Sequence, residues 1–273
     1  MKKSRYVFFI SDRTGITSEG LGEALLSRFD YVEFKKRTYP FVDSVEKAKA
    51  LVATVTQLVE CGNERPLIFS SIVSTAIRKE IDRCPGMHID FFATFIHLIE
   101  KELQINASEA VGKTHGLNDT DKYDKRMEAL NFTLSHDDGV VYKNLAEAEV
   151  ILIGVSRTGK TPTCLYLALH YGIKAANYPM VDTDLSTLRL PHVLLPYKDK
   201  LFGLTIDPKR LHGIRTERRP ASHYAALDNC VKEVSLAEKI FEYNEIPYIS
   251  STRKSVEELA ACVLSETGLK RHF

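Results

Sequence analysis

The stretch Val150–Thr161, VILIGVSRTGKT, joins a run of four apolar residues to a glycine-rich turn that ends in lysine and threonine. The turn satisfies GxxxxGK[ST] in full, the pattern of a loop whose backbone wraps around phosphate groups. Such a loop needs a buried strand before it, which 150–153 supplies, and a helix after it. Pro162 is tolerated in the first turn of that helix, and Gly172 provides a stop. The stretch therefore predicts a strand, a phosphate loop and a helix in succession.

The chemistry of this loop follows from its residue types. Glycines let successive backbone N–H groups approach phosphate oxygens, and the start of a helix adds partial positive charge. Lys160 is predicted to neutralise the charge that develops on the terminal phosphates, and the Thr161 hydroxyl is predicted to bind Mg²⁺. The simpler interpretation is a glycine-rich turn that only tolerates these residues. The nucleotide-binding residues that we predict are Gly154, Val155, Ser156, Arg157, Thr158, Gly159, Lys160 and Thr161.

Phosphoryl transfer to a hydroxyl also needs a carboxylate that accepts a proton or helps to hold the metal. One candidate, Asp207, follows the apolar run 201–206, so we expect it at the carboxyl end of a buried strand. There it would hold Mg²⁺ together with Thr161 or serve as the catalytic acid–base group. The simpler interpretation is a turn residue before Pro208.

Two further pairs of acidic residues are candidates. Asp137 and Asp138 belong to an HDDG segment just before the phosphate-loop strand, although Asp-Gly is also a common turn. Asp182 and Asp184 follow the next predicted strand at a spacing used for metal binding, although such residues also cap helices. The residues alone leave the choice of the catalytic acid–base group open among Asp137, Asp138 and Asp207.

Four arginines follow Asp207 closely, at positions 210, 215, 218 and 219. Arg215 and Arg219 are four apart, so they would share one face of a helix and could clamp phosphate oxygens. A solvated charged face is the ordinary interpretation of the same pattern.

Apolar strands alternate with helical patterns on both sides of the loop. Predicted strands lie at 6–10, 32–37, 66–70, 150–153, 175–178, 201–206 and 248–250. Predicted helices lie at 18–29, 45–60, 74–83, 91–103, 160–171, 221–244 and 256–267. The polar segment 106–138 weakens this pattern and is the expected hinge. The sequence thus predicts an α/β fold with an N-terminal α/β lobe, 1–135, and a C-terminal P-loop kinase-like lobe with a parallel sheet, 136–273; no internal repeat is evident.

Charge and composition exclude several classes of protein. The chain has 273 residues, with 37 Lys and Arg against 36 Asp and Glu, so no global basic field points to nucleic acid. No segment approaches the roughly 20 apolar residues of a membrane helix, and the run 6–10 is too short for a signal-peptide core. Scattered cysteines favour a reducing, cytoplasmic environment over disulfides or structural zinc. They are Cys61, Cys84, Cys164, Cys230 and Cys262.

Six segments in order resemble the bacterial phosphoenolpyruvate synthase regulatory proteins, which are related to the pyruvate, phosphate dikinase regulatory proteins. They run through nearly the whole chain, so the resemblance is specific to this family and not to phosphate loops in general. Arg13 stands where the family often has glycine, which adds a charge to the first turn. The segments are Ser11–Thr17 (SDRTGIT), Thr114–Leu117 (THGL), His136–Gly139 (HDDG), Gly154–Thr163 (GVSRTGKTPT), Ala176–Pro179 (ANYP) and Lys200–Pro208 (KLFGLTIDP).

This resemblance implies a bifunctional serine/threonine kinase and phosphorylase that regulates phosphoenolpyruvate synthase. The kinase would move the β-phosphate of ADP to a threonine of the synthase, inactivating it and releasing AMP; in this family the neighbouring catalytic histidine of the target is already phosphorylated. The phosphorylase would use inorganic phosphate to remove that group, release pyrophosphate and reactivate the synthase. Both directions are one reaction type, so one loop could serve both, and ADP would then compete with phosphate. The sequence is compatible with a homodimer.

Two other functions fit the phosphate loop when the resemblance is set aside. One is a small-molecule P-loop kinase that uses ATP, and the other is a nucleotide-sensing interaction module without transfer chemistry. The two-lobe layout favours a large protein substrate over a small one.

Overall fold

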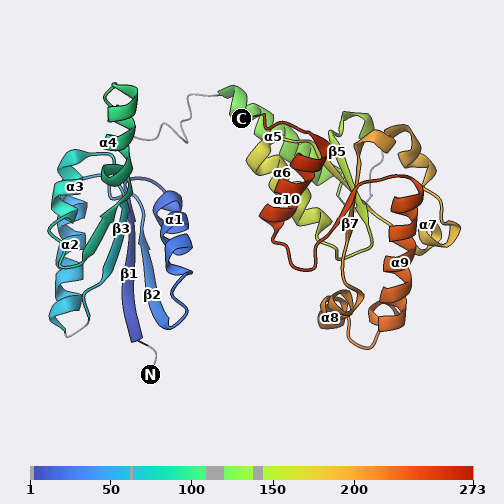
Figure 1. Cartoon of the computed structure of the whole chain (residues 1–273), viewed down its shortest axis with the longest axis horizontal. Coiled ribbons are helices and arrows are strands. Elements are labelled where there is room, and N and C mark those ends of the chain that lie inside the picture. The colour runs from blue at the N-terminus through green and yellow to red at the C-terminus, as the bar shows by residue number, and fades with distance from the viewer. Residues whose placement is uncertain (1–2, 62–63, 109–119, 138–143, 273) are drawn as a thin grey trace. The chain divides into compact units, whose positions relative to one another are not determined.

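The computed structural model describes residues 3–61, 64–108, 120–137 and 144–272. The chain divides into two compact units, Met1–Gly116 and Leu117–Phe273, and each contains a parallel sheet (Figure 1). The two-lobe α/β fold expected from the sequence is confirmed. The expected boundary at 135/136 falls at the end of helix α5 (Thr120–Ser135), whereas the two units divide after Gly116; α5 packs on α6 and β6 and so belongs to the second unit.

The first unit alternates strands with helices along the chain: β1 (Lys3–Ser11), α1 (Ile16–Leu26), β2 (Val32–Tyr39), α2 (Val45–Glu60), β3 (Leu67–Ser71), α3 (Thr75–Ile81), β4 (Met87–Asp90) and α4 (Phe91–Leu103). The described strands form one sheet in the order β2-β1-β3-β4. Side chains alternate between the two faces of β1. Phe8 and Ile10 join the core beneath α2 and α3, whereas Val7 and Phe9 pack with residues of α1 and α4. Helices therefore cover both faces of the sheet, as its apolar central strands require.

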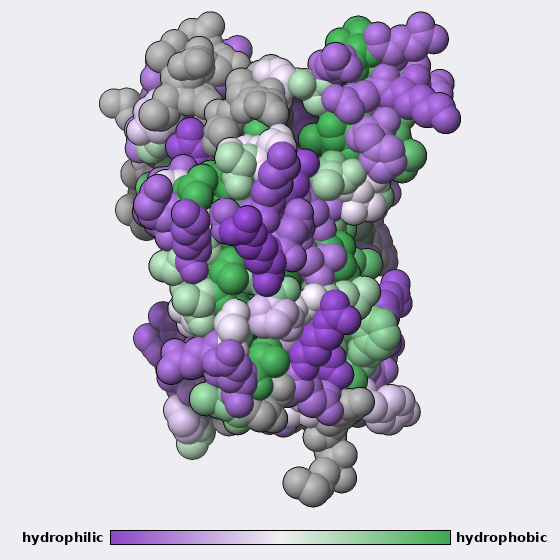
Figure 2. Space-filling model, turned by 90° about the vertical axis from the view of Figure 1, so that its left-hand side faces the viewer, coloured by the Kyte–Doolittle hydropathy of each residue, from purple (hydrophilic) through white to green (hydrophobic). Residues whose placement is uncertain are grey.

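One face of the first unit is largely polar. Figure 2 views this unit from the side on which α2 and α3 lie in Figure 1, and hydrophilic residues dominate that face. Its hydrophobic residues are scattered, which is normal for a solvated surface. Over the described ranges, every helix is too short or too polar to cross a membrane.

The second unit is larger and holds the quoted loop. Its described elements are α5 (Thr120–Ser135), η1 (Leu145–Glu147), β5 (Val150–Gly154), α6 (Lys160–Tyr171), β6 (Ala175–Pro179), α7 (Asp182–Thr187), η2 (His192–Lys200), β7 (Leu201–Thr205), α8 (Pro208–Arg218), η3 (His223–Ala225), α9 (Leu227–Tyr243), β8 (Tyr248–Ser250) and α10 (Val256–Thr267). The sheet order is β6-β5-β7-β8, with all neighbours parallel. One face of β5 packs with α6 and α10 through Val150 and Leu152, and the other packs with α7, α8 and α9 through Ile151 and Ile153.

This strand order places a ligand site at the end of β5. The chain leaves β5 through α6 to reach β6 on one side, and β7 then pairs with β5 on the other side. In open parallel sheets such a switch point opens a crevice beyond the carboxyl ends of the strands. The loop that follows β5 lies at that crevice.

The two units repeat one strand order, although no internal repeat is evident in the sequence. In each sheet the first strand pairs with the second on one side and the third on the other. Each first strand also leads through Arg-Thr-Gly into a helix, at 13–15 and at 157–159. Gly15 and Gly159 cap those helices with φ of 85° and 91°, a conformation that favours glycine.

All seven predicted strands are present, with small shifts at their ends, but several described elements were not among those predicted: α5, β4, α7, α8 and the 3-10 helices η1, η2 and η3. The described part of the expected hinge 106–138 contains helix α5. The helix was not predicted because only a few of its side chains are buried, among them Ala129 and Phe132, so its mostly polar sequence shows no apolar helical period. Strand β4 has four residues and two of them are polar. The six-residue helix α7 is too short to show a period. The THGL segment, 114–117, lies outside the described residues.

Candidate functional site

The loop from Gly154 to Thr161 adopts the conformation that its glycines permit. Gly154, Arg157 and Gly159 have φ of 152°, 78° and 91°. A Cβ at Gly154 would lie 2.2 Å from the carbonyl oxygen of Leu204, so only glycine lets β5 approach β7 this closely. The loop therefore sits directly above the switch point, with helix α6 beginning at Lys160.

Lys160 is buried within its own loop. The residue is 4% exposed, and Nζ donates a hydrogen bond of 2.8 Å to the carbonyl oxygen of Val155. The Thr158 hydroxyl donates to the same carbonyl at 3.1 Å. The ammonium is thus held inside the turn formed by the loop, where a bound phosphate could exchange for the carbonyl.

A cavity of about 720 Å³ opens beside the loop. Its charged lining residues are mostly positive: Arg157, Lys160, Arg218 and Arg219, against the one carboxylate of Asp137. This charge balance suits a ligand that carries several negative charges. A diphosphate or a phosphorylated side chain has that property.

Asp137, Thr161 and Asn177 meet at one end of this cavity. Thr161 Oγ1 donates to Asp137 Oδ1 at 2.8 Å, and Asn177 Nδ2 donates to the same oxygen at 2.6 Å and to Thr161 Oγ1 at 3.0 Å. Asn177 is 4% exposed, and its side-chain carbonyl oxygen is buried with no hydrogen-bond partner among the described residues. The sequence analysis assigned Asp137 and Thr161 to the same reaction without predicting a contact between them, and the structure shows that they are hydrogen-bonded.

Helix α5 holds Asp137 in this position. The Thr133 hydroxyl donates to the Ala175 carbonyl at 2.9 Å, and the Asn177 backbone N–H donates to the His136 carbonyl at 3.0 Å. The His136 ring stacks on Phe132 of the same helix. These contacts fasten the end of α5 to β6, so the following carboxylate reaches the start of α6.

The other predicted acidic residues lie elsewhere or outside the described chain. Asp207 is exposed, and its Oδ1 accepts a hydrogen bond from the Arg210 N–H at the start of α8. It lines a second cavity of about 290 Å³ and not the one beside the phosphate loop. Asp184 accepts from the Val181 N–H and caps α7. Asp138 lies outside the described residues.

We expected Arg215 and Arg219 to clamp phosphate oxygens together, and for Arg215 this prediction is wrong. Arg215 is fully buried and donates to Glu233 Oε2 at 2.7 Å and to the Ser156 carbonyl at 3.1 Å. It therefore supports the loop from behind and does not face the cavity. Arg219 does line the cavity, together with Arg218, which sequence spacing did not select.

Asn177 and Tyr224 also line the cavity, and sequence reasoning did not select them as site residues. Asn177 belonged to a predicted buried strand, and a single amide between apolar neighbours was the signal that could have marked it. Tyr224 donates its hydroxyl hydrogen to Ser156 Oγ at 3.0 Å, and its ring lies 4.1 Å from the Arg215 guanidinium. Nothing in the local sequence distinguishes this tyrosine from others.

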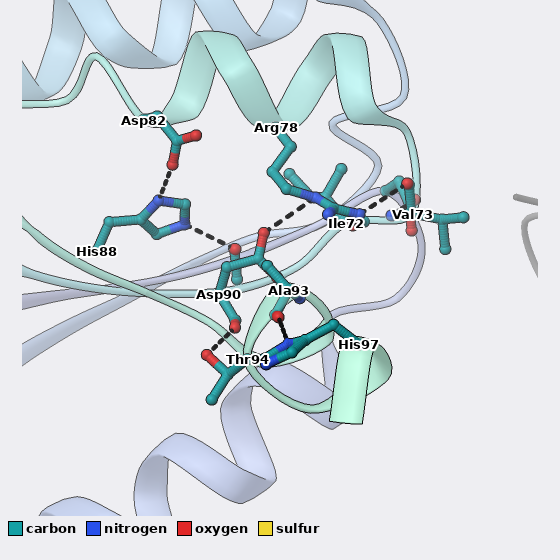
Figure 3. A network of polar contacts seen from close by, with 11 residues as sticks. Ile72, Val73, Arg78, Asp82, His88, Asp90, Ala93, Thr94 and His97 are labelled. Atoms are coloured by element: carbon teal, nitrogen blue, oxygen red, sulfur yellow. Dashed lines mark hydrogen bonds and ion pairs between the residues drawn. The ribbon is translucent and has the colours of Figure 1, made fainter. Parts of the chain in front are cut away.

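A second polar network lies in the first unit at the carboxyl end of its sheet. His88 is held between Asp82, which directly follows α3, and Ser70 on β3, at 2.7 and 2.8 Å (Figure 3). Arg78 reaches Asp90 at 3.1 Å, and Asp90 caps α4. The order Ser–His–Asp matches a nucleophile with its base, but Ser70 is 0% exposed and no substrate could reach it. The network fastens α3 and α4 to the sheet.

Neither the Cys164 thiol nor, within the described ranges, a cluster of acidic ligands offers a second candidate site near the phosphate loop. Cys164 lies on α6 behind the loop, and burial raises the pKa of its thiol, with the charge of Asp137 adding to the shift. It is therefore not a thiolate nucleophile. Within the described ranges, no three His, Cys, Asp or Glu side chains gather as metal ligands. A cation at the site would need neutral oxygens as well as Asp137.

Comparisons with known proteins match the whole chain. A family model described as kinase/pyrophosphorylase matches residues 7–264. Three relatives share the provisional name of phosphoenolpyruvate synthase regulatory protein. The one from Laribacter hongkongensis is 54% identical over 275 residues, and the one from Neisseria meningitidis serogroup B is 53% identical over 273; in both cases 100% of each chain is covered. The one from Marinobacter nauticus is 49% identical over 268 residues, covering 98% of this chain and 99% of its own.

Proposed function

The chain belongs to the kinase/pyrophosphorylase family, and on that basis we propose that it is a bifunctional serine/threonine kinase and phosphorylase that regulates phosphoenolpyruvate synthase. The kinase direction transfers the β-phosphate of ADP to a synthase threonine, inactivates the synthase and releases AMP. The phosphorylase direction transfers that phosphate to inorganic phosphate, releases pyrophosphate and activates the synthase. The observation that carries the proposal is the positively lined cavity beside the loop 154–161, with Lys160 and Thr161 at its edge.

In this proposal the loop binds a diphosphate through its backbone and its lysine. The N–H groups at the start of α6 and the Lys160 ammonium, released from the Val155 carbonyl, take the phosphate oxygens. Arg218 and Arg219 offset the remaining charge. Bound Mg²⁺ would neutralise charge on the diphosphate and keep it in line for transfer.

One loop can serve both directions because both exchange a phosphoanhydride bond with a threonine phosphate ester bond. A phosphoanhydride, ADP or pyrophosphate, stands on one side of the reaction and a threonine phosphate ester on the other. Inorganic phosphate would occupy the place of the α-phosphate of AMP. ADP and phosphate should therefore compete for the loop. Two sites are needed if they do not compete and loop variants separate the two activities.

The acid–base group would accept the threonine proton in the kinase direction and return it in reverse. We favour the HDDG segment, with Asp137 or Asp138, over Asp207, because Asp137 lines the cavity of the phosphate loop and Asp207 lines the other one. We also propose a cytoplasmic location, where the scattered cysteines would stay reduced.

The test incubates the protein with purified phosphoenolpyruvate synthase, phosphorylated on its catalytic histidine, and with β-labelled ADP or γ-labelled ATP. Label on a synthase threonine from ADP supports the proposal, and release of labelled pyrophosphate on addition of phosphate supports the reverse activity. Transfer only to small molecules from ATP would indicate a small-molecule kinase. Nucleotide binding without any transfer would indicate a sensing module.

Replacing the loop lysine sharpens the test. Lys160→Ala should lower the transfer rate by about 10²–10³-fold, since one electrostatic contact to the transferred group is lost. The exposed Lys254 gives a matched control, and Lys254→Ala should transfer at the normal rate. Both variants should keep the circular dichroism of the parent. Equal activity of the two variants would contradict a role for the loop in transfer.

A further inference from the structure

The contact of Asp137, Thr161 and Asn177 has the shape of a cation site. Their side chains come from the segment that follows α5, the first turn of α6 and strand β6, and all three line one cavity. We infer that they form a divalent-cation site to which each contributes one oxygen. The expected metal ligands were Thr161 and Asp207, so this inference keeps the threonine, replaces the aspartate and adds the amide.

The distances within the cluster fit one face of an octahedron. Mg²⁺ holds oxygens at about 2.0–2.1 Å in octahedral geometry, which places adjacent ligands about 3 Å apart. Thr161 Oγ1 and Asp137 Oδ1 are 2.8 Å apart. Asn177 Nδ2 lies 2.6 Å from Asp137 Oδ1 and 3.0 Å from Thr161 Oγ1. Three mutual distances near that value define a triangular face. No large movement of the chain is needed to place a cation against it.

The Asn177 amide gives the second, independent observation. Its nitrogen points at the carboxylate, and its carbonyl oxygen is buried without a partner among the described residues. A buried carbonyl without a hydrogen bond is costly, and native proteins rarely keep one without a reason. A half-turn of the amide would exchange the two atoms and bring the oxygen to the face. That orientation is unfavourable beside a bare carboxylate and favourable beside a cation.

The charge of the site indicates when a cation would bind. The cluster offers one carboxylate and two neutral oxygens, and the cavity also holds four cationic side chains. Such a site should hold a hard cation weakly by itself and more strongly when phosphate oxygens complete the coordination. In this respect the inference rests on the proposed function, because the phosphate groups would be those of ADP.

The test separates the metal from the nucleotide. Equilibrium dialysis measures the affinity for ADP in EDTA and the affinity for ADP in saturating Mn²⁺, and the ratio of the two isolates the contribution of the cation. The parent should bind the Mn²⁺ complex more tightly. Asp137→Asn and Asn177→Ala should each weaken binding of the Mn²⁺ complex, so that the ratio falls by roughly 10–100-fold, the usual effect of disturbing a metal site. Both residues line the ADP cavity, so the affinity in EDTA is measured for each variant and its ratio is taken against that value. Asp207→Asn is the matched control and should leave the ratio unchanged.

Asn177→Asp distinguishes a cation ligand from a hydrogen-bond donor. If residue 177 supplies an oxygen to a cation, the added carboxylate should maintain or raise the ratio, and Mn²⁺ should stabilise this variant against heat more than it stabilises the parent. If the amide serves only as a donor to Asp137, two carboxylates would repel each other and the ratio should fall as it does for Asn177→Ala. That second result, or a ratio that responds only to Asp207→Asn, would overturn the inference.

Failure of the inference and failure of the proposed function give different results. ADP that binds in EDTA with a ratio unchanged in all variants leaves the nucleotide site in place and removes the cation site. If ADP does not bind under either condition, the proposed function fails. Binding of Mn²⁺ alone, followed by electron paramagnetic resonance, then decides: a loss of affinity in Asp137→Asn and Asn177→Ala supports the cation site, and equal affinity in all proteins rejects it.

Discussion

Gly154 shows how a single residue fixes the distance between two strands. Its φ is 152°, and an added Cβ would lie 2.2 Å from the backbone oxygen of Leu204, which cannot move aside as a side chain can. Gly154→Ala should therefore destabilise the second unit by roughly 1–3 kcal/mol, the usual cost of overpacking, and should weaken binding at the phosphate loop. Gly213 is the control, because it lies in α8 with open space around its Cβ position.

Gly213→Ala should stabilise the protein by about 0.5–1 kcal/mol, since alanine is the better helix former. Urea unfolding of the two variants measures both changes. A Gly154→Ala variant with the same free energy of unfolding as Gly213→Ala would mean that β5 and β7 can move apart without cost.

Cys84 predicts a pH dependence at the residue scale. Burial, with a smaller effect from the Asp82 charge, raises the pKa of its thiol from 9.0 to about 11. A folded-state pKa above the unfolded one contributes stability that is complete below pH 9 and is lost as the pH rises through about 11. Over that range the parent should lose more stability than Cys84→Ala, because the variant has no thiol to ionise.

Urea unfolding between pH 8 and pH 11 compares the two proteins. The exposed Cys61 gives the control, and Cys61→Ala should follow the parent at every pH. Thiol labelling at pH 8 should likewise modify Cys61 before Cys84. Parallel stability curves for the parent and Cys84→Ala would show that Cys84 ionises equally in both states.

At the scale of elements, Arg215 connects α8 to α9 and to the phosphate loop. Burial alone would lower the pKa of its guanidinium, but the hydrogen bond and charge of Glu233 outweigh it and raise the pKa. Removing one member of a buried ion pair leaves an uncompensated charge, so Glu233→Gln should cost about 3–5 kcal/mol. A Glu233→Leu and Arg215→Met double variant should recover much of that loss.

The double variant should nevertheless bind ADP more weakly than the parent, because the Ser156 carbonyl loses its hydrogen bond from Arg215. Thermal unfolding and ADP titration together measure this separation of stability from binding. A double variant with the parent's ADP affinity would mean that the loop holds its shape without help from α8.

The same elements show what the sequence could and could not predict. The strand, loop and helix of 150–171 were predicted well because all their signals are local: an apolar run, glycines, a lysine and a stop. The contact of Asp137 with Asn177 joins residues 40 apart, and the pairing of Arg215 with Glu233 joins residues 18 apart on two helices. Such contacts depend on how helices pack on the sheet, which side-chain spacing does not encode. Asp207 follows β7 as predicted, but it lines the second cavity and not the one beside the phosphate loop.

At the scale of the whole molecule, the chain carries two sheets of one strand order with different chemistry at equivalent places. The first unit reads Arg-Thr-Gly-Ile-Thr at 13–17, and the second reads Arg-Thr-Gly-Lys-Thr at 157–161. Ile16 begins α1 where Lys160 begins α6, and it is 65% exposed. The first unit thus has the turn without the ammonium. We expect diphosphate binding in the second unit alone.

Separate cores make that expectation measurable. The apolar clusters of the first unit contain no described residue beyond Phe91, and those of the second contain none before Phe132. Scanning calorimetry should therefore resolve two unfolding transitions. ADP binds only the folded second unit in this scheme, so it should raise one transition, by about 2.7 kcal/mol of stability when ADP is at 100 times its Kd. Lys160→Ala should abolish that shift and Ile16→Ala should keep it. If ADP raised both transitions together, the units would unfold as one, and a shift lost in Ile16→Ala would place the nucleotide in the first unit.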